Sequence, residues 1–317
     1  MAGPRFENTP VSRRLFLRSA AHCIGASLAA QISKRAVASV PQLSKSDVEQ
    51  FRAELLHMVN RERKAHGVSS LALDDLACAV AAQHAHDMAT GGFLSHWGSD
   101  GRKPYHRYSL AGGFDSVAEN VSAVRNLEAL DAKYVGLVLA QAHQRMHDET
   151  PPDDGHRQTI LAPQHTHVGF GMALSGRDLR LVELYVAKYV RIDPYQVRAK
   201  RRSSMQVSGK VLDRKYALYY VEVFYEPLPL PPVKGWLNEP RPYGLPDDYV
   251  VLRPKLPPGT LYADGVKGTI EVGQDGRFHI PVSLNREDAG IYTVVVWISR
   301  KGSRGAFQAT NACILAE

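Results

Sequence analysis

Hydrophobic residues recur at helical spacing in three stretches of the first half of the chain, and each stretch predicts a helix that buries one face. These stretches are residues 46–66, 75–91 and 127–149. The first begins with Ser46 and Glu49, a capping-box pair that satisfies free backbone amides at a helix start. Gly67 and Gly92 are typical stops for the first and second helices, and Pro151 cannot continue the third.

Strand-like runs follow these helices. A short helix is predicted at residues 156–161, and residues 167–173 and 179–192 have the composition of strands. Helices that precede returning strands predict a layered α+β sandwich. Residues 93–125, between the second and third helices, are rich in glycine and are predicted to be irregular.

The pattern changes to period two in the second half of the chain, where no helix-length pattern appears. The predicted strands are residues 205–212, 216–225, 268–272, 277–284, 292–298 and 307–315. Their number and spacing are typical of an all-β sandwich. Asp288, Gly290 and Tyr292 resemble the corner of immunoglobulin-like domains, in which a tyrosine hydroxyl fixes a strand crossover. The proline-dense residues 226–246 are too long for a hairpin loop and are expected to pack as an extended excursion.

The first residues have the order of an export signal. Arg13 and Arg14 lie in a segment that resembles the twin-arginine motif, an apolar stretch follows at residues 20–32, and small residues at 36–38 offer a cleavage site. We therefore expect residues 1–38 to be a twin-arginine (Tat) signal peptide. This implies a bacterial protein that is exported to the periplasm or secreted to the cell exterior. A basic amphipathic helix or an unstructured arm is the alternative.

Positive charge is concentrated in this segment. The chain has a formal net charge of +7, whereas residues 1–38 hold six basic side chains and one acidic side chain, so the rest is near +2. Such a balance offers no general basic surface for nucleic acid. No apolar run reaches the roughly 18–20 residues that span a bilayer. We therefore expect neither a nucleic-acid partner nor a transmembrane segment.

Polar residues separate the two halves of the chain. We predict a short extension at residues 39–45, a first domain at residues 46–192, a basic linker at residues 193–204 and a second domain at residues 205–317. The linker carries a basic cluster at residues 198–202 that is expected to be solvated. Contact of this cluster with anionic lipid, cell-wall polymer or nucleic acid is the alternative.

Three cysteines bear on stability and catalysis. Cys23 lies in the predicted signal, and Cys78 and Cys313 lie in different predicted domains, so we expect no disulfide. Cys78 lies mid-helix among alanines, where a buried, inert thiol is expected. No Gly-x-Ser-x-Gly elbow follows the signal, so the sequence gives no support to nucleophilic catalysis.

Five segments of the first domain match a known family in order. They are Asn60-Arg61-Glu62-Arg63 with Gly67, Ser95-His96 with Asp100-Gly101 and Arg107, Ala118-Glu119-Asn120-Val121, Asp154-Gly155-His156-Arg157 with Ile160-Leu161, and His167-Val168-Gly169-Phe170-Gly171. Together they resemble the bacterial branch of the CAP superfamily (SCP domain; cysteine-rich secretory, antigen 5, plant pathogenesis-related). The resemblance implies a three-layer αβα sandwich for residues 46–192, which the all-β, immunoglobulin-like sandwich follows.

The resemblance also implies a site. In the family, two histidines and two acidic residues meet in a cleft, and they carry over to His96, Glu119, Glu149 and His156. Asp148 or Asp154 can take the place of Glu149, because Glu149 lies only seven positions before His156.

The chemistry of such a cluster is open to two interpretations. His96 and His156 can ligate Zn²⁺ weakly and exchangeably, with positions left open. Alternatively, each carboxylate orients one imidazole and no metal is held. Glu119 and Asn120 can also serve mainly to fix the loop around them.

A second pair of histidines has metal-site spacing. His143 and His147 lie at i and i+4 on the predicted third helix, as in zinc peptidases, but Gln144 stands where such enzymes have their glutamate base. Chance pairing is the simpler explanation, because histidines are abundant in this chain.

Two functional hypotheses follow from the resemblance. The first is an exported, non-catalytic protein whose cleft binds a small ligand, such as a lipid or a divalent metal, with the β-sandwich contacting the cell envelope or a protein partner. The second is a metal-assisted hydrolase or peptidase, with His96 and His156 as ligands and Glu119 or Glu149 as base.

Overall fold

The structure, a computed structural model, describes residues 43–303 and 305–317. The predicted signal peptide at residues 1–38 lies outside the described residues. The first part of the chain comprises α1 (Lys45–Ala65), β1 (Ala72–Leu73), α2 (Asp75–Gly91), α3 (Pro104–Leu110), β2 (Ser116–Val124), α4 (Ala132–His147), α5 (Gly155–Leu161), β3 (His167–Ser175) and β4 (Asp178–Ala187).

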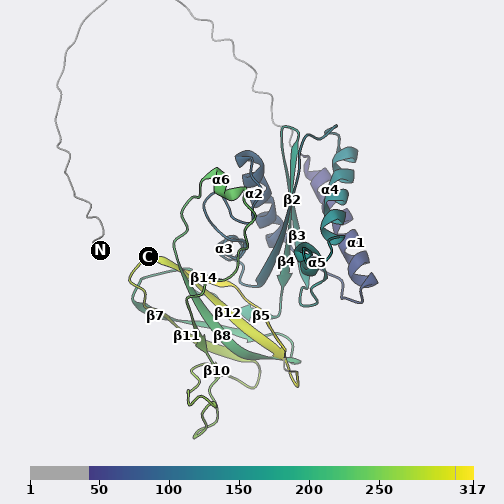
Figure 1. The fold of residues 1–317 in the computed structure, drawn as a ribbon. Coiled ribbons are helices and arrows are strands. Elements are labelled where there is room, and N and C mark those ends of the chain that lie inside the picture. The colour runs from purple at the N-terminus through teal and green to yellow at the C-terminus, as the bar shows by residue number, and fades with distance from the viewer. Residues whose placement is uncertain (1–42, 304) are drawn as a thin grey trace, which may run out of the picture. The chain divides into compact units, whose positions relative to one another are not determined.

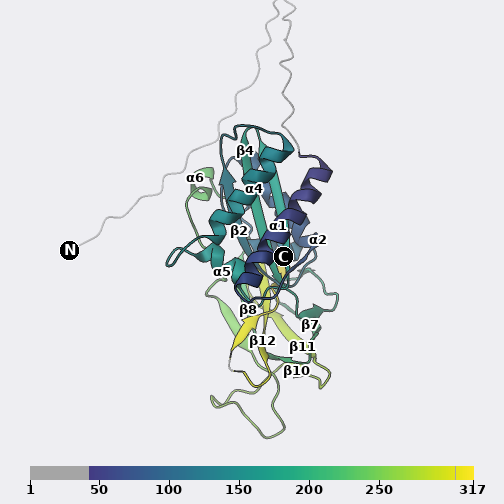
Figure 2. The ribbon, with the colours of Figure 1, turned by 90° about the vertical axis from the view of Figure 1, so that its right-hand side faces the viewer.

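These elements form three layers around one sheet. The strands are ordered β1-β3-β4-β2, with β3 antiparallel to β4 and β4 antiparallel to β2. Helices α1, α4 and α5 cover one face of the sheet, and α2 covers the other (Figure 1). Figure 2 shows α1 and α4 side by side on their face. The predicted αβα sandwich is therefore confirmed.

Two glycines of β3 bring α2 against the sheet. A Cβ atom on Gly169 would lie 2.3 Å from the carbonyl carbon of Ala77, and one on Gly171 would lie 2.0 Å from that of Ala81. Both distances are far inside van der Waals contact, so only glycine fits opposite this alanine-rich helix. The neighbouring positions Val168 and Phe170 point to the opposite face, where they pack under α1 and α4.

Several predicted boundaries were wrong. The helix at the start of the domain is capped by Ser44, whose hydroxyl oxygen accepts from Asp47 N at 3.1 Å, and not by Ser46. Residues 93–125 were predicted to be irregular, yet they contain α3 and β2. Helix α3 has only 7 residues, too few for a periodic pattern. Strand β2 carries two buried polar residues, Glu119 and Asn120, which hide its alternation.

The second part of the chain is a two-sheet β-sandwich, as predicted. Its strands are β5 (Val190–Ile192), β6 (Arg198–Ala199), β7 (Ser203–Val211), β8 (Tyr216–Pro227), β9 (Tyr249–Leu252), β10 (Glu271–Val272), β11 (Arg277–Leu284), β12 (Gly290–Arg300), β13 (Ala306–Gln308) and β14 (Ala312–Ala316). One sheet has the order β10-β11-β7-β5; the other has the order β6-β14-β12-β8-β9, with β13 paired to β12. Tyr292 Oη accepts from Arg286 N at 2.8 Å, which is the contact expected of a tyrosine corner.

Strand β14 joins the two parts of the chain. Ile314 belongs to the core of the β-sandwich, whereas Cys313 and Leu315 belong to the core beneath α2 and α3. Cys313 N donates to Ser109 Oγ at 2.7 Å, and Val117 N donates to Asn311 Oδ1 at 3.0 Å. Alternate side chains of β14 therefore belong to two different hydrophobic cores.

The segment predicted as a basic linker runs along β14. Strand β6 lies within residues 193–204 and pairs in parallel with β14. The guanidinium of Arg198 lies 2.6 Å from Glu317 Oε1, and that of Arg202 lies 2.6 Å from Glu287 Oε1.

Cys78 and Cys313 are both buried and both free. No helix within the described part of the chain has the length and hydropathy needed to cross a membrane.

Candidate functional site

A cavity of about 420 Å³ opens where β2, α5 and the connection between β8 and β9 meet. Its lining includes His96, Glu119, Glu149 and His156, the four residues implied at the sequence level, together with Asn120 and Tyr243. The structure therefore places all four around one cavity, although His96 and His156 are 60 positions apart in the sequence.

Glu119 is the buried anion of this cavity. It lies on β2 opposite Leu184 of β4 and is 3% exposed. His96 Nδ1 lies 3.0 Å from Glu119 Oε1, and an Arg107 guanidinium nitrogen donates to Oε2 at 2.6 Å. Burial alone would raise the pKa of Glu119, but the charge of Arg107 and the neighbouring His84 and His96 lower it to about 2. The group is therefore a carboxylate, and His96 must donate through Nδ1.

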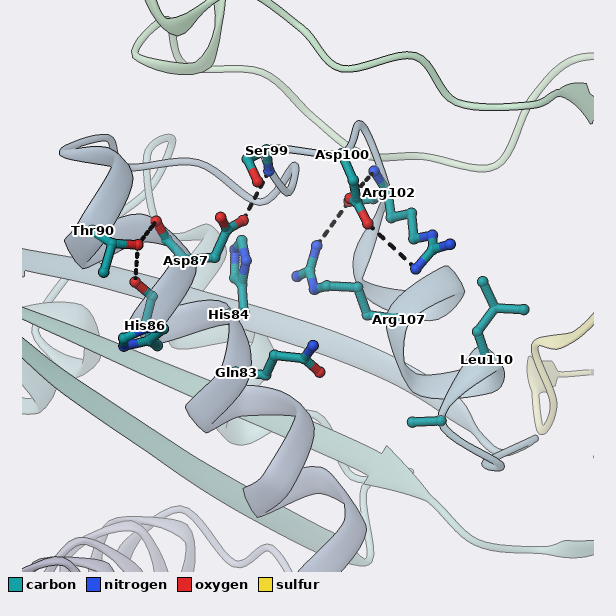
Figure 3. A pocket seen from close by; sticks show the side chains of 11 residues that line it. Gln83, His84, His86, Asp87, Thr90, Ser99, Asp100, Arg102, Arg107 and Leu110 are labelled. Atoms are coloured by element: carbon teal, nitrogen blue, oxygen red, sulfur yellow. Dashed lines mark hydrogen bonds and ion pairs between the residues drawn. The ribbon is translucent and has the colours of Figure 1, made fainter.

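Two side chains behind Glu119 hold the loop that carries His96. Arg107 donates to the carbonyl oxygens of His96 and Arg102, each at 2.8 Å. His84 Nε2 lies 2.8 Å from the carbonyl oxygen of Ser95. Burial and the nearby Arg107 lower the pKa of His84 to about 4, so its ring is neutral at pH 7. Figure 3 shows His84 and Arg107 in the lining of a second cavity, of about 470 Å³.

His156 has a carboxylate partner of its own. Its Nδ1 lies 2.5 Å from Glu149 Oε1, and its backbone N donates to Glu149 Oε2 at 3.0 Å. Of the three acids considered for this position, Glu149 makes the contact. Asp148 instead accepts from Gln144, and Asp154 accepts from Gln158.

The two imidazoles therefore share one arrangement. Each donates its Nδ1 proton to a carboxylate, so in the neutral form of the ring the lone pair is on Nε2. Within residues 43–303 and 305–317, neither Nε2 has a protein hydrogen-bond partner. The side chains of His96 and His156 are 21% and 33% exposed, so a ligand in the cavity can reach both rings.

Asn120 connects the strand to the helix of the second histidine. Its Nδ2 donates to the carbonyl oxygen of His156 at 3.1 Å and lies 3.4 Å from Glu183 Oε2. The sequence led us to expect that Asn120 fixes the loop around it; these contacts instead join β2 to α5 and β4. Glu119 combines such a role with contact to His96.

Tyr243 was missed by sequence reasoning. Its ring lies 4.6 Å, centroid to centroid, from that of His96, and its hydroxyl oxygen accepts from Glu119 N at 2.8 Å. It is 124 positions from Glu119, in a proline-rich segment of the second half. No periodicity or motif links the two residues, so only the fold could reveal the contact.

His143 and His147 contact different acidic side chains. His143 Nδ1 lies 2.6 Å from Glu183 Oε1 and its Nε2 lies 2.8 Å from Glu62 Oε2, whereas His147 contacts Asp148. Burial would lower the pKa of His143, but the two carboxylates raise it to about 10, so the ring is a buried cation. In the described residues, no group of three or more His, Cys, Asp or Glu side chains is arranged to hold a metal ion.

Residues 56–189 match the family model for CAP, described as the cysteine-rich secretory protein family. Three solved structures are similar at low identity. An extracellular SCP-domain protein from Bacillus anthracis is 20% identical (TM-score 0.34) and is matched over 46% of this chain and 44% of its own. An outer surface protein from Borrelia burgdorferi is 16% identical (TM-score 0.35) over 46% and 97%. The CAP domain of Enterococcal PrgA is 15% identical (TM-score 0.35) over 46% and 64%. No curated protein matches the chain.

Proposed function

We propose, on the premise that this chain contains a CAP domain at residues 56–189, that the cavity between His96 and His156 binds a small polar ligand. One observation carries the proposal. Both imidazoles are oriented by a carboxylate through Nδ1, and neither Nε2 has a partner among the residues that the structure describes, although both rings line the same cavity. The lining includes His, Glu, Asp, Asn and Thr side chains, which can hydrogen-bond to a polar group of the ligand.

A divalent cation fits the charge of this cavity. Arg107 neutralises Glu119, whereas Glu149 and Asp153 also line the cavity and leave it negatively charged beside two imidazole lone pairs. A carboxylate behind a metal-bound histidine is a common arrangement, because it fixes the tautomer and raises the basicity of the ring. His96 and His156 would hold the ion, and the ion would act as a Lewis acid on a bound ligand. Two protein donors make such binding weak and exchangeable.

A hydrolase is the second candidate, and one observation favours it. A neutral imidazole held by a carboxylate through Nδ1 can accept a proton at Nε2, which is the arrangement of a general base. In this hypothesis His96 or His156 activates water, with or without a metal. Thr159 also lines the cavity, but its hydroxyl donates to the carbonyl oxygen of Gly155 in its own helix.

The context of the domain is part of the proposal. The twin-arginine pattern at residues 12–18 supports export to the periplasm or the cell exterior. The β-sandwich would then contact the cell envelope or a protein partner.

Calorimetric titration of Zn²⁺ into the wild type, His96→Ala and His156→Ala tests the binding proposal. His57→Ala, at an exposed position of α1, is the matched control. We expect each cavity variant to lose at least about tenfold in affinity, because loss even of a residue that only supports a ligand costs about that much, and the control to bind as the wild type does. Equal binding by all four proteins would contradict the proposal. Digestion of a peptide library that stops in His156→Ala would favour the hydrolase.

A further inference from the structure

The segment from Glu226 to Pro246, here called the strap, leaves the β-sandwich after β8 and crosses the CAP domain. It contains α6 (Lys234–Leu237), which lies beside the end of α2 (Figure 1), where a Cβ atom on Gly92 would be 2.9 Å from Lys234 Nζ. Asn238 Oδ1 accepts from Leu94 N at 3.3 Å, just beyond the end of α2. The strap therefore contacts the first part of the chain just beyond the end of α2.

One lysine of the CAP domain holds both ends of the strap. Lys103 Nζ lies 2.7 Å from Glu226 Oε2 and donates to the carbonyl oxygen of Gly244 at 3.2 Å. Glu226 also accepts from Tyr105 Oη at 2.9 Å and lies 3.0 Å from His106 Nε2. Lys103 is only 5% exposed, so these polar contacts are largely shielded from water.

Aromatic contacts fix the middle of the strap. The rings of Trp236 and Trp97 meet edge to face at 5.2 Å, and the guanidinium of Arg241 lies 4.5 Å from the Trp236 ring centroid. Trp97 follows His96 directly in the chain. The strap is therefore anchored next to the loop that carries one of the two cavity histidines.

These contacts position Tyr243 of the strap in the lining of the cavity. Its ring lies 4.6 Å from His96, and its hydroxyl oxygen accepts from Glu119 N. Trp236, Leu237 and Tyr243 all pack in or against the core beneath α2, and Tyr243 also belongs to the cavity lining. Tyr243 thus contacts both members of the His96–Glu119 pair.

We propose that Tyr243 is the specificity-determining residue of the cavity, because its ring limits the size of the group that can reach His96 Nε2. This inference rests on the proposed function of the cavity as a binding site. The site is then built from both halves of the chain, and it accepts a small polar ligand on the His96 side while His156 stays open to larger groups.

Histidine modification of the full chain tests this inference without knowledge of the natural ligand. Diethyl pyrocarbonate is a small reagent for imidazole nitrogen, and 4-bromophenacyl bromide is a bulkier one. Peptide mass spectrometry gives the rate at His96 and at His156 for each reagent. Tyr243→Ala opens the wall, Tyr243→Phe keeps the ring, and Tyr219→Ala removes an exposed tyrosine of β8 as a matched control.

In Tyr243→Ala we expect His96 to react about two- to tenfold faster with the small reagent, the factor that loss of one aromatic contact gives. The increase should be larger for the bulkier reagent. His156 should be unchanged, and Tyr243→Phe and Tyr219→Ala should react as the wild type does. Equal increases for the two reagents, or no increase, would overturn the proposal.

A folding defect is recognised by faster reaction at buried His143, which is shielded in the intact protein. In that case Trp236→Ala decides, because it loosens the strap at a position outside the cavity and should raise the His96 rate more than the His156 rate. No selective increase in that variant would count against the proposal. Failure of Zn²⁺ to bind would instead contradict the proposed function, and the modification rates would still report on Tyr243.

Discussion

The ammonium nitrogen of Lys103 lies 2.7 Å from Glu226 Oε2, so a residue at the start of α3 is paired with one at the end of β8. Burial would raise the pKa of Glu226, but the hydrogen bond and charge of His106, with Lys103, lower it to about 2. The pair is therefore ionic across the whole neutral range, and it joins the two halves of the chain beside the cavity.

Replacing Lys103 with Met should destabilise the protein by about 3 kcal/mol, because removal of one partner leaves a shielded charge unpaired. The free energy of unfolding in urea measures the effect. Lys210→Met is the control, because Lys210 pairs at 3.5 Å with Asp275 at the surface, where a pair contributes roughly 0–1 kcal/mol. Similar losses in the two variants would show that the Lys103 pair has no special role.

The buried cation His143 should make stability fall with rising pH. Its pKa is raised from 6.5 to about 10 in the folded protein, so its contribution is complete below pH 6.5 and is lost as the pH approaches 10. Between these limits the free energy of unfolding should fall by up to about 1.4 kcal/mol per pH unit. Urea unfolding of the wild type and His143→Gln, followed from pH 6 to 10, tests this. The same slope in both proteins would refute the assignment.

The close approach of α2 to β3 should make Gly171 intolerant of a side chain. Gly171→Ala places a Cβ atom 2.0 Å from the carbonyl carbon of Ala81, where backbone must move. We expect a loss of about 1–3 kcal/mol, as for other overpacked cores. Gly235→Ala is the control, because no atom from elsewhere in the described residues lies within 4 Å of its Cβ position. Thermal unfolding of both variants distinguishes packing from a general effect of alanine.

Replacing Arg13 and Arg14 with lysine should retain the protein in the cytoplasm, because the twin-arginine pathway depends on this pair. Cell fractionation shows the location of the variant, and intact mass gives the N-terminus of the exported wild type, expected near Ser39. Unimpaired export of the double variant, with a mass that begins at Met1, would contradict the signal-peptide assignment.

The sequence predicted the parts of the fold that local chemistry controls. Helix α2 ends at a glycine with positive φ, Gly92, and begins after Asp74, whose side chain caps it, so both of its boundaries could be read from the sequence. Strand β2 could not, because its buried Glu119 and Asn120 break the alternation that identifies a strand. In this chain, the polar residues that form the site are the ones that conceal its secondary structure.

The candidate site was predicted in part for a related reason. His96, Glu119 and His156 lie in segments that resemble a known family, whereas the second acid was left open among three neighbours. Glu149 is the one of the three that contacts His156, because the turn before α5 directs its carboxylate to both the ring and the backbone N of His156. Tyr243 depends on how two halves of the chain pack, and no local pattern encodes such a contact.

The contacts of strand β14 determine when the first part of the chain can complete its folding during synthesis. The backbone N of Cys313 donates a hydrogen bond to Ser109 Oγ, 204 positions earlier in the chain, and Leu315 belongs to the core beneath α2. Until β14 has been synthesised, the apolar surface of α3 lacks the partner that completes its core, so the first part of the chain cannot finish packing. A nascent chain stalled before β14 should therefore expose hydrophobic surface to chaperones, and the native state should form only after β14 has emerged from the exit tunnel.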